Sequence, residues 1–297
     1  MYKMILWGLG ADYNFNYNSI KYMELTKQME VVAVTARDVP VCKSIDGYRV
    51  INKEIIRFED FDYIIVMNKK FFMDIRAEII ALGVNCDKIL SDYFLDVPNI
   101  VLDDYISLKK AKRTIVSNNC WGGIISHSLG LENMSPFKNL FLKDDDYIKL
   151  ISNFEGYIKY EPKFVKWNID IHSKKEYPVL QLKDIEIHCN HDKEANEAIL
   201  KWKRRCKKIN LNDMFIEMYT CDRNIAEKFC ELEQYDKKIC FVPFKTYMKD
   251  MMQLSILPEQ EEFWEAVNQS AGNKKNGYVY NIVDLLNGIR TERIVWN

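Results

Sequence analysis

The chain has 297 residues, of which 48% are hydrophobic and 29% are charged, and its formal net charge is -1. This length favours two domains, and the composition is ordinary for a globular protein with a buried core. A net charge near zero argues against a general electrostatic attraction to nucleic acid or to an anionic membrane. We therefore expect a small-molecule or glycan ligand and no nucleic-acid partner.

The cysteines and the apolar segments indicate in which cellular compartment the protein is expected. Eight cysteines are spread along the chain, and no two have C-x-x-C spacing. The first residues lack the long apolar core of a signal peptide, and no apolar run approaches the roughly 18 residues of a membrane span. We expect reduced cysteines and a cytoplasmic protein without a membrane span. The oligomeric state stays open.

The first hundred residues alternate short apolar runs with helical patterns. The runs at residues 4–7, 31–34, 63–67 and 88–90 are typical of buried strands. Helical spacing of apolar residues follows the first and third of these runs. Strands that alternate with helices predict an α/β fold with a parallel sheet.

A glycine-rich turn follows the first predicted strand. Gly8 and Gly10 match the first two glycines of G-x-G-x-x-G, a loop that holds phosphate at a helix N-terminus. Tyr13 stands where the third glycine is expected, and Asp38 lies slightly late for the acidic residue that binds a ribose. Gly8, Gly10 and Asp38 are the candidate ligand-binding residues. The alternative is that this domain is a scaffold that no longer binds a nucleotide.

The order of segments in this region resembles that of a known bacterial domain. It runs through the segments WGLG, VVAVTARD, IDGYRVI, FDYIIVMN and LGVNCDKIL. This order resembles the small Rossmann-like domain that heads many bacterial proteins of polysaccharide and nucleotide-sugar metabolism. The resemblance implies a nucleotide or nucleotide-sugar as ligand. Only Gly8 and Gly10 match the glycine loop of that domain.

The domain boundary is expected near residue 105. Residues 92–108 include a proline and an acidic pair, and a basic run leads into the next predicted strand. We predict a Rossmann-like domain at residues 1–104 and a larger α/β domain at residues 105–297. In the second domain we also predict a helix around residues 263–267, a helix at 278–286 and an edge strand at 294–296.

The most informative segment of the second domain is the sequence SNNCWGG at residues 117–123. It stands between a predicted strand at 114–116 and a helical pattern at 124–129. Open α/β folds place their sites at such strand ends. We predict a site around Cys120, with the following ligand-binding residues: Asn118, Asn119, Trp121, Gly122 and Gly123. The alternative is that the cysteine and the tryptophan pack under a tight turn.

A second informative segment spans residues 184–210. Residues 185–189 alternate as in a strand with one apolar face, and His191 follows the end of that strand. His188 and His191 do not have the spacing of a helical zinc motif, so no metal is expected. The basic residues of the next helix predict a solvated face, with an acidic or phosphorylated ligand as the alternative.

These two segments also resemble known families. The first, SNNCWGGIISHSLGLENMSPFKNLFL, is followed by DYIKLISNFEGYI and by DIEIHCNHDKEANEAILKWKRRCKKIN. Together they resemble a bacterial domain of unknown function that occurs in proteins of exopolysaccharide biosynthesis. They are more distantly similar to papain-like cysteine peptidases. That similarity implies Cys120 as nucleophile and His191 as general base, and Asp222, at a predicted strand end, is proposed as their partner.

Two functions follow from these patterns. The first is an enzyme of surface-polysaccharide biosynthesis, a transferase or hydrolase that acts on a sugar or acyl substrate through Cys120 and His191. Helix amides beside Cys120 are expected to lower the pKa of its thiol and to bind an oxyanion. The second is a non-catalytic protein of the same pathway that binds a nucleotide or a sugar. An oxidoreductase is disfavoured because the glycine loop is incomplete.

Overall fold

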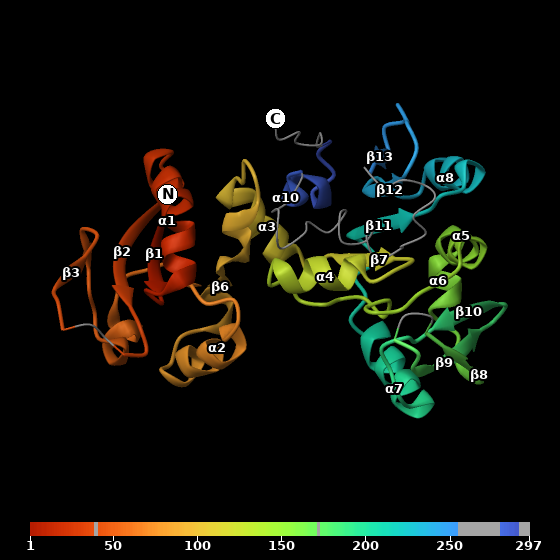
Figure 1. Cartoon of the computed structure of the whole chain (residues 1–297), viewed down its shortest axis with the longest axis horizontal. Helices are drawn as coiled ribbons and strands as arrows, with labels where there is room; N and C mark the ends of the chain where they lie inside the picture. Colours follow the sequence, from red (N-terminus) through yellow and green to blue (C-terminus); the bar gives the residue numbers. More distant parts are fainter. Residues whose placement is uncertain (39–40, 171–172, 255–279, 291–297) are drawn as a thin grey trace. The chain divides into compact units, whose positions relative to one another are not determined.

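The computed structural model describes residues 1–38, 41–170, 173–254 and 280–290 (Figure 1). The chain divides into unit 1, which holds Met1–Ser107 and Ser128–Gly130, and unit 2, which holds Leu108–His127 and Leu131–Asn297. Both units are α/β, as the sequence predicts. The helix predicted around residues 263–267 and the strand predicted at 294–296 lie outside the described residues.

A parallel sheet of four strands forms the centre of unit 1. Its strands are β1 (Tyr2–Trp7), β2 (Met29–Thr35), β5 (Tyr63–Val66) and β6 (Ile89–Ser91), in the order β2-β1-β5-β6. Every pairing in this sheet is parallel, which confirms the predicted alternation of strands and helices. The two main helices are α1 (Ala11–Leu25) and α2 (Phe72–Ala81). Ile75 and Ile79 of α2 are buried in a core with residues of β1 and β5, because they recur at helical spacing.

The smaller elements of unit 1 connect these strands and helices. They are the hairpin β3 (Ser44–Ile45) and β4 (Tyr48–Arg49), and the 3-10 helices η1 (Lys53–Phe58), η2 (Cys86–Lys88) and η3 (Asp92–Asp96). Helix α3 (Leu102–Ala111) then leads out of unit 1. The boundary expected near residue 105 therefore falls within a helix.

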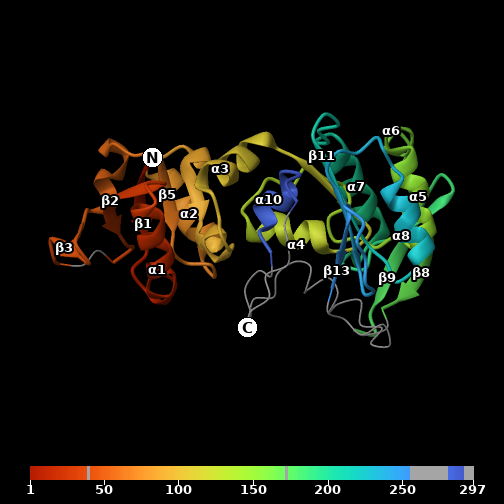
Figure 2. The same cartoon turned by 90° about the horizontal axis from the view of Figure 1, so that it is seen from above.

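A second parallel sheet organises unit 2. Its strands are β7 (Thr114–Ser117), β11 (Met214–Tyr219), β12 (Lys238–Val242) and β13 (Met251–Gln253), in the order β13-β12-β11-β7. Helices α5 (Asp144–Ser152) and α8 (Arg223–Cys230) lie side by side (Figure 2) and share a core with one face of this sheet. Helix α4 (Trp121–Ser128) packs Trp121 against Phe215 and Phe241 on the other face. Unit 2 also contains the short helices α6 (Phe154–Tyr157) and α10 (Ile282–Leu286).

An antiparallel sheet is inserted between β7 and β11 in the sequence. It consists of β8 (Lys163–Ile169), β9 (Glu176–Leu182) and β10 (Ile185–His188), and α7 (Ala195–Cys206) packs on β9 and β8 (Figure 1). The sequence predicts β10 but not β8 or β9. Every residue of β8 is exposed, so this strand lacks the alternation that marks a half-buried strand.

Within the part of the chain that the structure describes, no helix combines the length and the apolar character that a membrane span requires.

Candidate functional site

The site begins where the side chain of Asn118 continues the sheet beyond the end of β7. Its Oδ1 accepts a hydrogen bond from the Tyr219 N–H at 3.1 Å, and its Nδ2 donates to the Tyr219 carbonyl oxygen at 3.0 Å. The amide side chain thus replaces a peptide group in the pairing with β11. The backbone leaves the sheet at Asn118, and the Asn118 side chain takes the place beside β11 that a further residue of β7 would occupy.

The next turn starts helix α4 directly after Cys120. Asn119 Oδ1 accepts a hydrogen bond from the Trp121 N–H at 2.7 Å, and Ser117 Oγ accepts one from the Gly122 N–H at 3.1 Å. These two side chains cap N–H groups that the first turn of a helix leaves without partners. Cys120 is therefore fixed at the carboxyl edge of the sheet, as the sequence predicts, and is 3% exposed.

A short bridge brings His191 to this edge. The Leu142 N–H donates to the Asn118 carbonyl oxygen at 3.0 Å, and Phe141 exchanges two backbone hydrogen bonds of 2.9 Å with His188 in β10. Past β10, the Asp192 N–H donates to the Cys189 carbonyl oxygen at 2.9 Å, which turns the chain at His191. As a result, His191 Nε2 lies 3.3 Å from Cys120 Sγ although the residues are 71 positions apart. The sequence pairs these two residues, but the strand that leads to His191 belongs to the antiparallel sheet and not to the parallel sheet of β7.

The electrostatics of the thiol differ from the expectation. Burial and, to a smaller extent, the nearby Glu217 together raise the pKa of the Cys120 thiol to about 12. The prediction that the helix amides lower this pKa is wrong, because the sulfur is almost completely removed from water and lies near an acidic group. At neutral pH the thiol therefore keeps its proton, and the exposed imidazole of His191 lies beside it.

Glu217 is a part of the site that sequence reasoning missed. It lies in the central strand β11, opposite Ser117 of β7, and it is 0% exposed. Its Oε1 accepts a hydrogen bond from Asn119 Nδ2 at 3.2 Å, and burial raises its pKa to about 8. The available signal was an acidic residue in the middle of the otherwise apolar strand MFIEMY.

Most of the predicted ligand contacts in this segment instead build the turn. Trp121 is 0% exposed and packs between aromatic rings of the core, so its observed role is packing, and its contact with a ligand stays a prediction. Asn118 and Asn119 are buried, and their amides hold the backbone and the α4 cap. A Cβ at Gly122 would lie 2.8 Å from Ser117 Oγ, and one at Gly123 would lie 2.6 Å from Asn139 Oδ1. These glycines allow close packing rather than contact with a ligand.

The proposed third member, Asp222, has another role in the structure. Its Oδ1 accepts hydrogen bonds from the N–H groups of Asn224 and Ile225 at 2.8 and 3.2 Å, which caps α8. A carboxylate at a helix N-terminus is stabilised there by the helix dipole. Its participation with Cys120 and His191 stays a prediction.

His188 is a buried residue of the fold. It is 4% exposed, its Nδ1 lies 3.2 Å from the Tyr177 hydroxyl, and burial lowers its pKa. These contacts make His188 a part of the packing of the antiparallel sheet. The described residues also contain no group of three or more His, Cys, Asp or Glu side chains placed to hold a metal ion.

The glycine loop of unit 1 borders a cavity of about 260 Å³. Gly8 has φ +111°, and a Cβ there would lie 3.0 Å from the Met67 carbonyl oxygen, so the backbone itself requires glycine. A Cβ at Gly10 would meet no heavy atom within 4 Å, so this position is open to a ligand. The cavity lies between the ends of β1 and β5, where the strand order reverses and doubly wound sheets bind ligands.

Two residues near this loop depart from the predicted pattern. Asp38 is exposed and is absent from the cavity lining, whereas the neighbouring Arg37 lines it. The ribose role of Asp38 stays a prediction, and the cavity lining supplies a cation, Arg37, at the neighbouring position. Tyr13, which replaces the third glycine, is 2% exposed and donates a hydrogen bond to Asp46 at 2.8 Å. Its side chain is thus part of the packing of α1.

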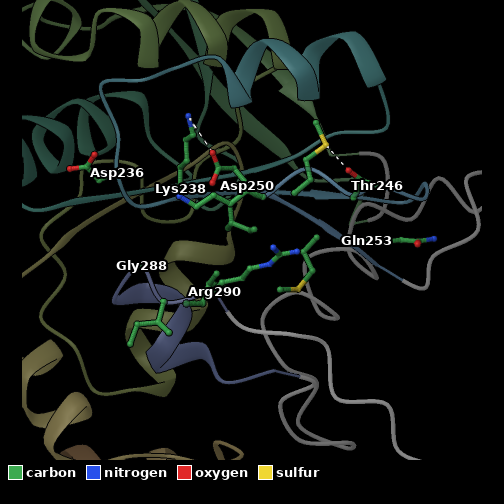
Figure 3. Close-up of a pocket in the computed structure, with 13 residues that line it drawn as sticks. Asp236, Lys238, Thr246, Asp250, Gln253, Gly288 and Arg290 are labelled. Atoms are coloured by element: carbon green, nitrogen blue, oxygen red, sulfur yellow. Dashed lines mark hydrogen bonds and ion pairs between the residues drawn. The ribbon is translucent and has the colours of Figure 1, made fainter.

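A larger cavity of about 430 Å³ lies elsewhere in unit 2 (Figure 3). Its walls include Arg290 and the ion pair between Lys238 and Asp250, whose charged atoms are 3.7 Å apart. Lys238 begins β12, whereas Cys120 follows the carboxyl end of the parallel strand β7. The residues that line this cavity include neither Cys120 nor His191.

Taken together, these features define an α/β protein with a buried thiol beside an imidazole. Residues 93–287 match the family described as domain of unknown function (DUF1919), and residues 1–90 match the one described as C2185-like, N-terminal. The first match covers more than half of the chain. The chain therefore belongs to the DUF1919 family. The matched segment includes both Cys120 and His191.

One relative is an uncharacterized protein of Haemophilus influenzae. It is 34% identical over 132 residues, which make up 44% of this chain and 58% of that protein. The match thus spans somewhat more than half of the length of this relative.

Proposed function

We propose that this protein is a thiol-dependent transferase or hydrolase in which Cys120 is the nucleophile and His191 is the general base. The observation that carries the proposal is the 3.3 Å separation between Cys120 Sγ and His191 Nε2. A cysteine nucleophile needs a base within hydrogen-bonding reach. The resemblance to proteins of exopolysaccharide biosynthesis suggests a sugar or acyl substrate of that pathway, with the protein acting in the cytoplasm.

The raised pKa of Cys120 decides how the pair would react. At neutral pH the sulfur is protonated, so His191 Nε2 accepts the proton while the sulfur attacks the carbonyl carbon of an acyl substrate. The carbonyl electrons move to oxygen. When they return, the leaving group departs with the proton from His191. Water or a sugar hydroxyl then releases the acyl group from the thioester, and its proton returns to the sulfur through His191.

The backbone also limits which donors can stabilise the oxyanion. The N–H groups of Trp121 and Gly122 already donate to Asn119 and Ser117. Among the described residues, none accepts a hydrogen bond from the Cys120 N–H. This N–H is therefore the donor we assign to the oxyanion, because it lies beside the attacking sulfur.

The test is the rate at which iodoacetamide alkylates Cys120, mapped by mass spectrometry because the chain has eight cysteines. We expect His191→Gln to slow this reaction at least about tenfold at pH 7, since glutamine cannot accept the proton. His127→Gln, at an exposed histidine of α4, is the matched control and should leave the rate unchanged.

His191→Ala then distinguishes a histidine that accepts the proton from one that only shields the sulfur from solvent. A histidine that only shields the buried sulfur would give faster labelling when it is truncated to alanine, and an unchanged rate in His191→Gln. That pair of results would overturn the proposal.

A second candidate function rests on the cavity of unit 1. Arg37 and the open space at Gly10 lie at the carboxyl end of the sheet, beside the N-terminus of α1. A guanidinium group and a helix N-terminus both favour a phosphate. A protein that binds a nucleotide or nucleotide-sugar without catalysis should show a thermal shift with such compounds, and the shift should persist in Cys120→Ser.

A further inference from the structure

The carboxyl group of Glu217 is enclosed beneath the turn that carries Cys120. Its residue is 0% exposed, and it stands in the central strand β11, between Ser117 of β7 and Ile239 of β12. Oε1 accepts the hydrogen bond from Asn119, but Oε2 has no hydrogen-bond partner within the described part of the chain. An acidic group in such a place costs stability, and the packing of the strand alone gives no reason for it.

Glu217 is linked to the thiol in two ways. Asn119 connects them through its side chain, because Nδ2 donates to Glu217 while Oδ1 caps the Trp121 N–H beside Cys120. The second link is electrostatic, since the charge of an ionised Glu217 disfavours the Cys120 thiolate.

Among the described residues, the ionisable groups on which the charge of Glu217 acts do not neutralise it. They are Cys120 in the turn and, in the core on the other face of the sheet, Tyr147 of α5 and Cys240 of β12. Burial raises the pKa of each of them, so all three are neutral between pH 6 and 9. Asp144 of α5 lies beyond Asn118, with 3.4 Å between its Oδ1 and Asn118 Nδ2, and adds a second acidic group.

We infer that Glu217 is a positioning residue of the Cys120–His191 pair, which holds Asn119 under the thiol and opposes formation of the thiolate once its own carboxyl group is ionised. This inference rests on the proposed function only in that it concerns the same cysteine. The ionised carboxyl group of Glu217 makes Cys120 less reactive in alkaline solution than an isolated buried thiol would be. With a Glu217 pKa of about 8, the effect begins just above neutral pH.

The experiment measures the iodoacetamide alkylation rate of Cys120 in the full chain from pH 6 to pH 10. Glu217→Gln retains an oxygen for Asn119 but cannot ionise. We expect its rate to equal that of the natural protein at pH 6 and to exceed it at least about threefold at pH 9, because the neutral glutamine does not oppose the thiolate. Glu155→Gln, at an exposed glutamate of α6, is the control.

Two further measurements keep the test decisive. In His191→Gln, which removes the imidazole, the logarithm of the rate should rise by less than one unit per pH unit between pH 7.5 and 9, because Glu217 ionises in that interval. Glu217→Gln is compared in this background too, so the Glu217 effect is measured whether or not His191 is catalytic. Rates of Glu217→Gln that coincide with those of the natural protein at every pH, with a slope of one throughout in His191→Gln, would refute the inference alone.

Discussion

Asn118→Ala tests whether a single side chain completes the sheet at the site. The Asn118 amide accepts hydrogen bonds from the Tyr219 N–H at 3.1 Å and from Asn119 Nδ2 at 2.8 Å. It donates to the Tyr219 carbonyl oxygen at 3.0 Å and to Asp144 Oδ1 at 3.4 Å. Alanine removes all four bonds at a position that is 1% exposed.

The expected loss of stability follows from which groups lose their partner. Asn119 and Asp144 keep hydrogen bonds to Glu217 and Thr220, so they contribute little. Tyr219 loses a partner at both its N–H and its carbonyl oxygen, in a residue that is 8% exposed. A buried polar group without its partner costs about 1–3 kcal/mol, so the free energy of unfolding of unit 2 should fall by roughly 2–4 kcal/mol.

Urea unfolding followed by tryptophan fluorescence measures this change. Every tryptophan except Trp7 lies in unit 2, so the signal reports mainly on that unit. The urea midpoint should fall by roughly 1 M or more. Asn196→Ala, at an exposed residue of α7, is the matched control and should change the unfolding free energy by no more than about 0.5 kcal/mol.

Asn118→Asp tests whether the hydrogen bonds donated by the amide are needed, because aspartate has nearly the same shape but no N–H donor. Aspartate can still accept from the Tyr219 N–H, but it places a carboxylate oxygen against the Tyr219 carbonyl and against Asp144. It should destabilise unit 2 at pH 8 at least as much as alanine does. If both variants were as stable as Asn196→Ala, the amide would not act as an extension of β7, and our account of the turn would be wrong.

Three further predictions concern other parts of the chain. Gly10→Val should leave unfolding unchanged, because a Cβ there meets open space, but should abolish any thermal shift with nucleotides; retained binding would place the ligand elsewhere. Trp121→Ala should lower the unfolding free energy of unit 2 by about 3–5 kcal/mol in urea titrations, and Trp121→Phe by clearly less, whereas a mild alanine effect would contradict its core role. Asp92 is buried, and burial raises its pKa to about 7, so folded unit 1 retains a proton that the unfolded chain releases above about pH 4. Stability of unit 1 should therefore fall as pH rises from about 4 to 7, and urea unfolding followed by circular dichroism should show a flatter profile in Asp92→Asn.

The sequence by itself determined the features that depend on local patterns. Alternating apolar runs and helical spacing predict the parallel sheet of unit 1 and an α/β fold for unit 2, since burial on a strand or a helix repeats with a fixed period. The segment SNNCWGG predicts a strand end, a turn and a helix start. The pattern also predicts the approach of His191 to Cys120, but through strand ends of one parallel sheet; in the structure β10 lies in the antiparallel sheet, and the backbone bridge between Phe141 and His188 brings His191 to the thiol.

The tertiary structure decided the burial, the hydrogen-bond partners and the pKa values of those residues. The burial of Trp121 depends on Phe215 and Phe241, and the roles of Asn118 and Asn119 depend on Tyr219 and Glu217, all about a hundred positions away in the chain. The pKa of the Cys120 thiol rises because packing removes water from it and brings Glu217 close. Dielectric environment and distances between side chains are properties of the packed structure, whereas periodicity is a property of the chain, and only the latter can be read without the fold.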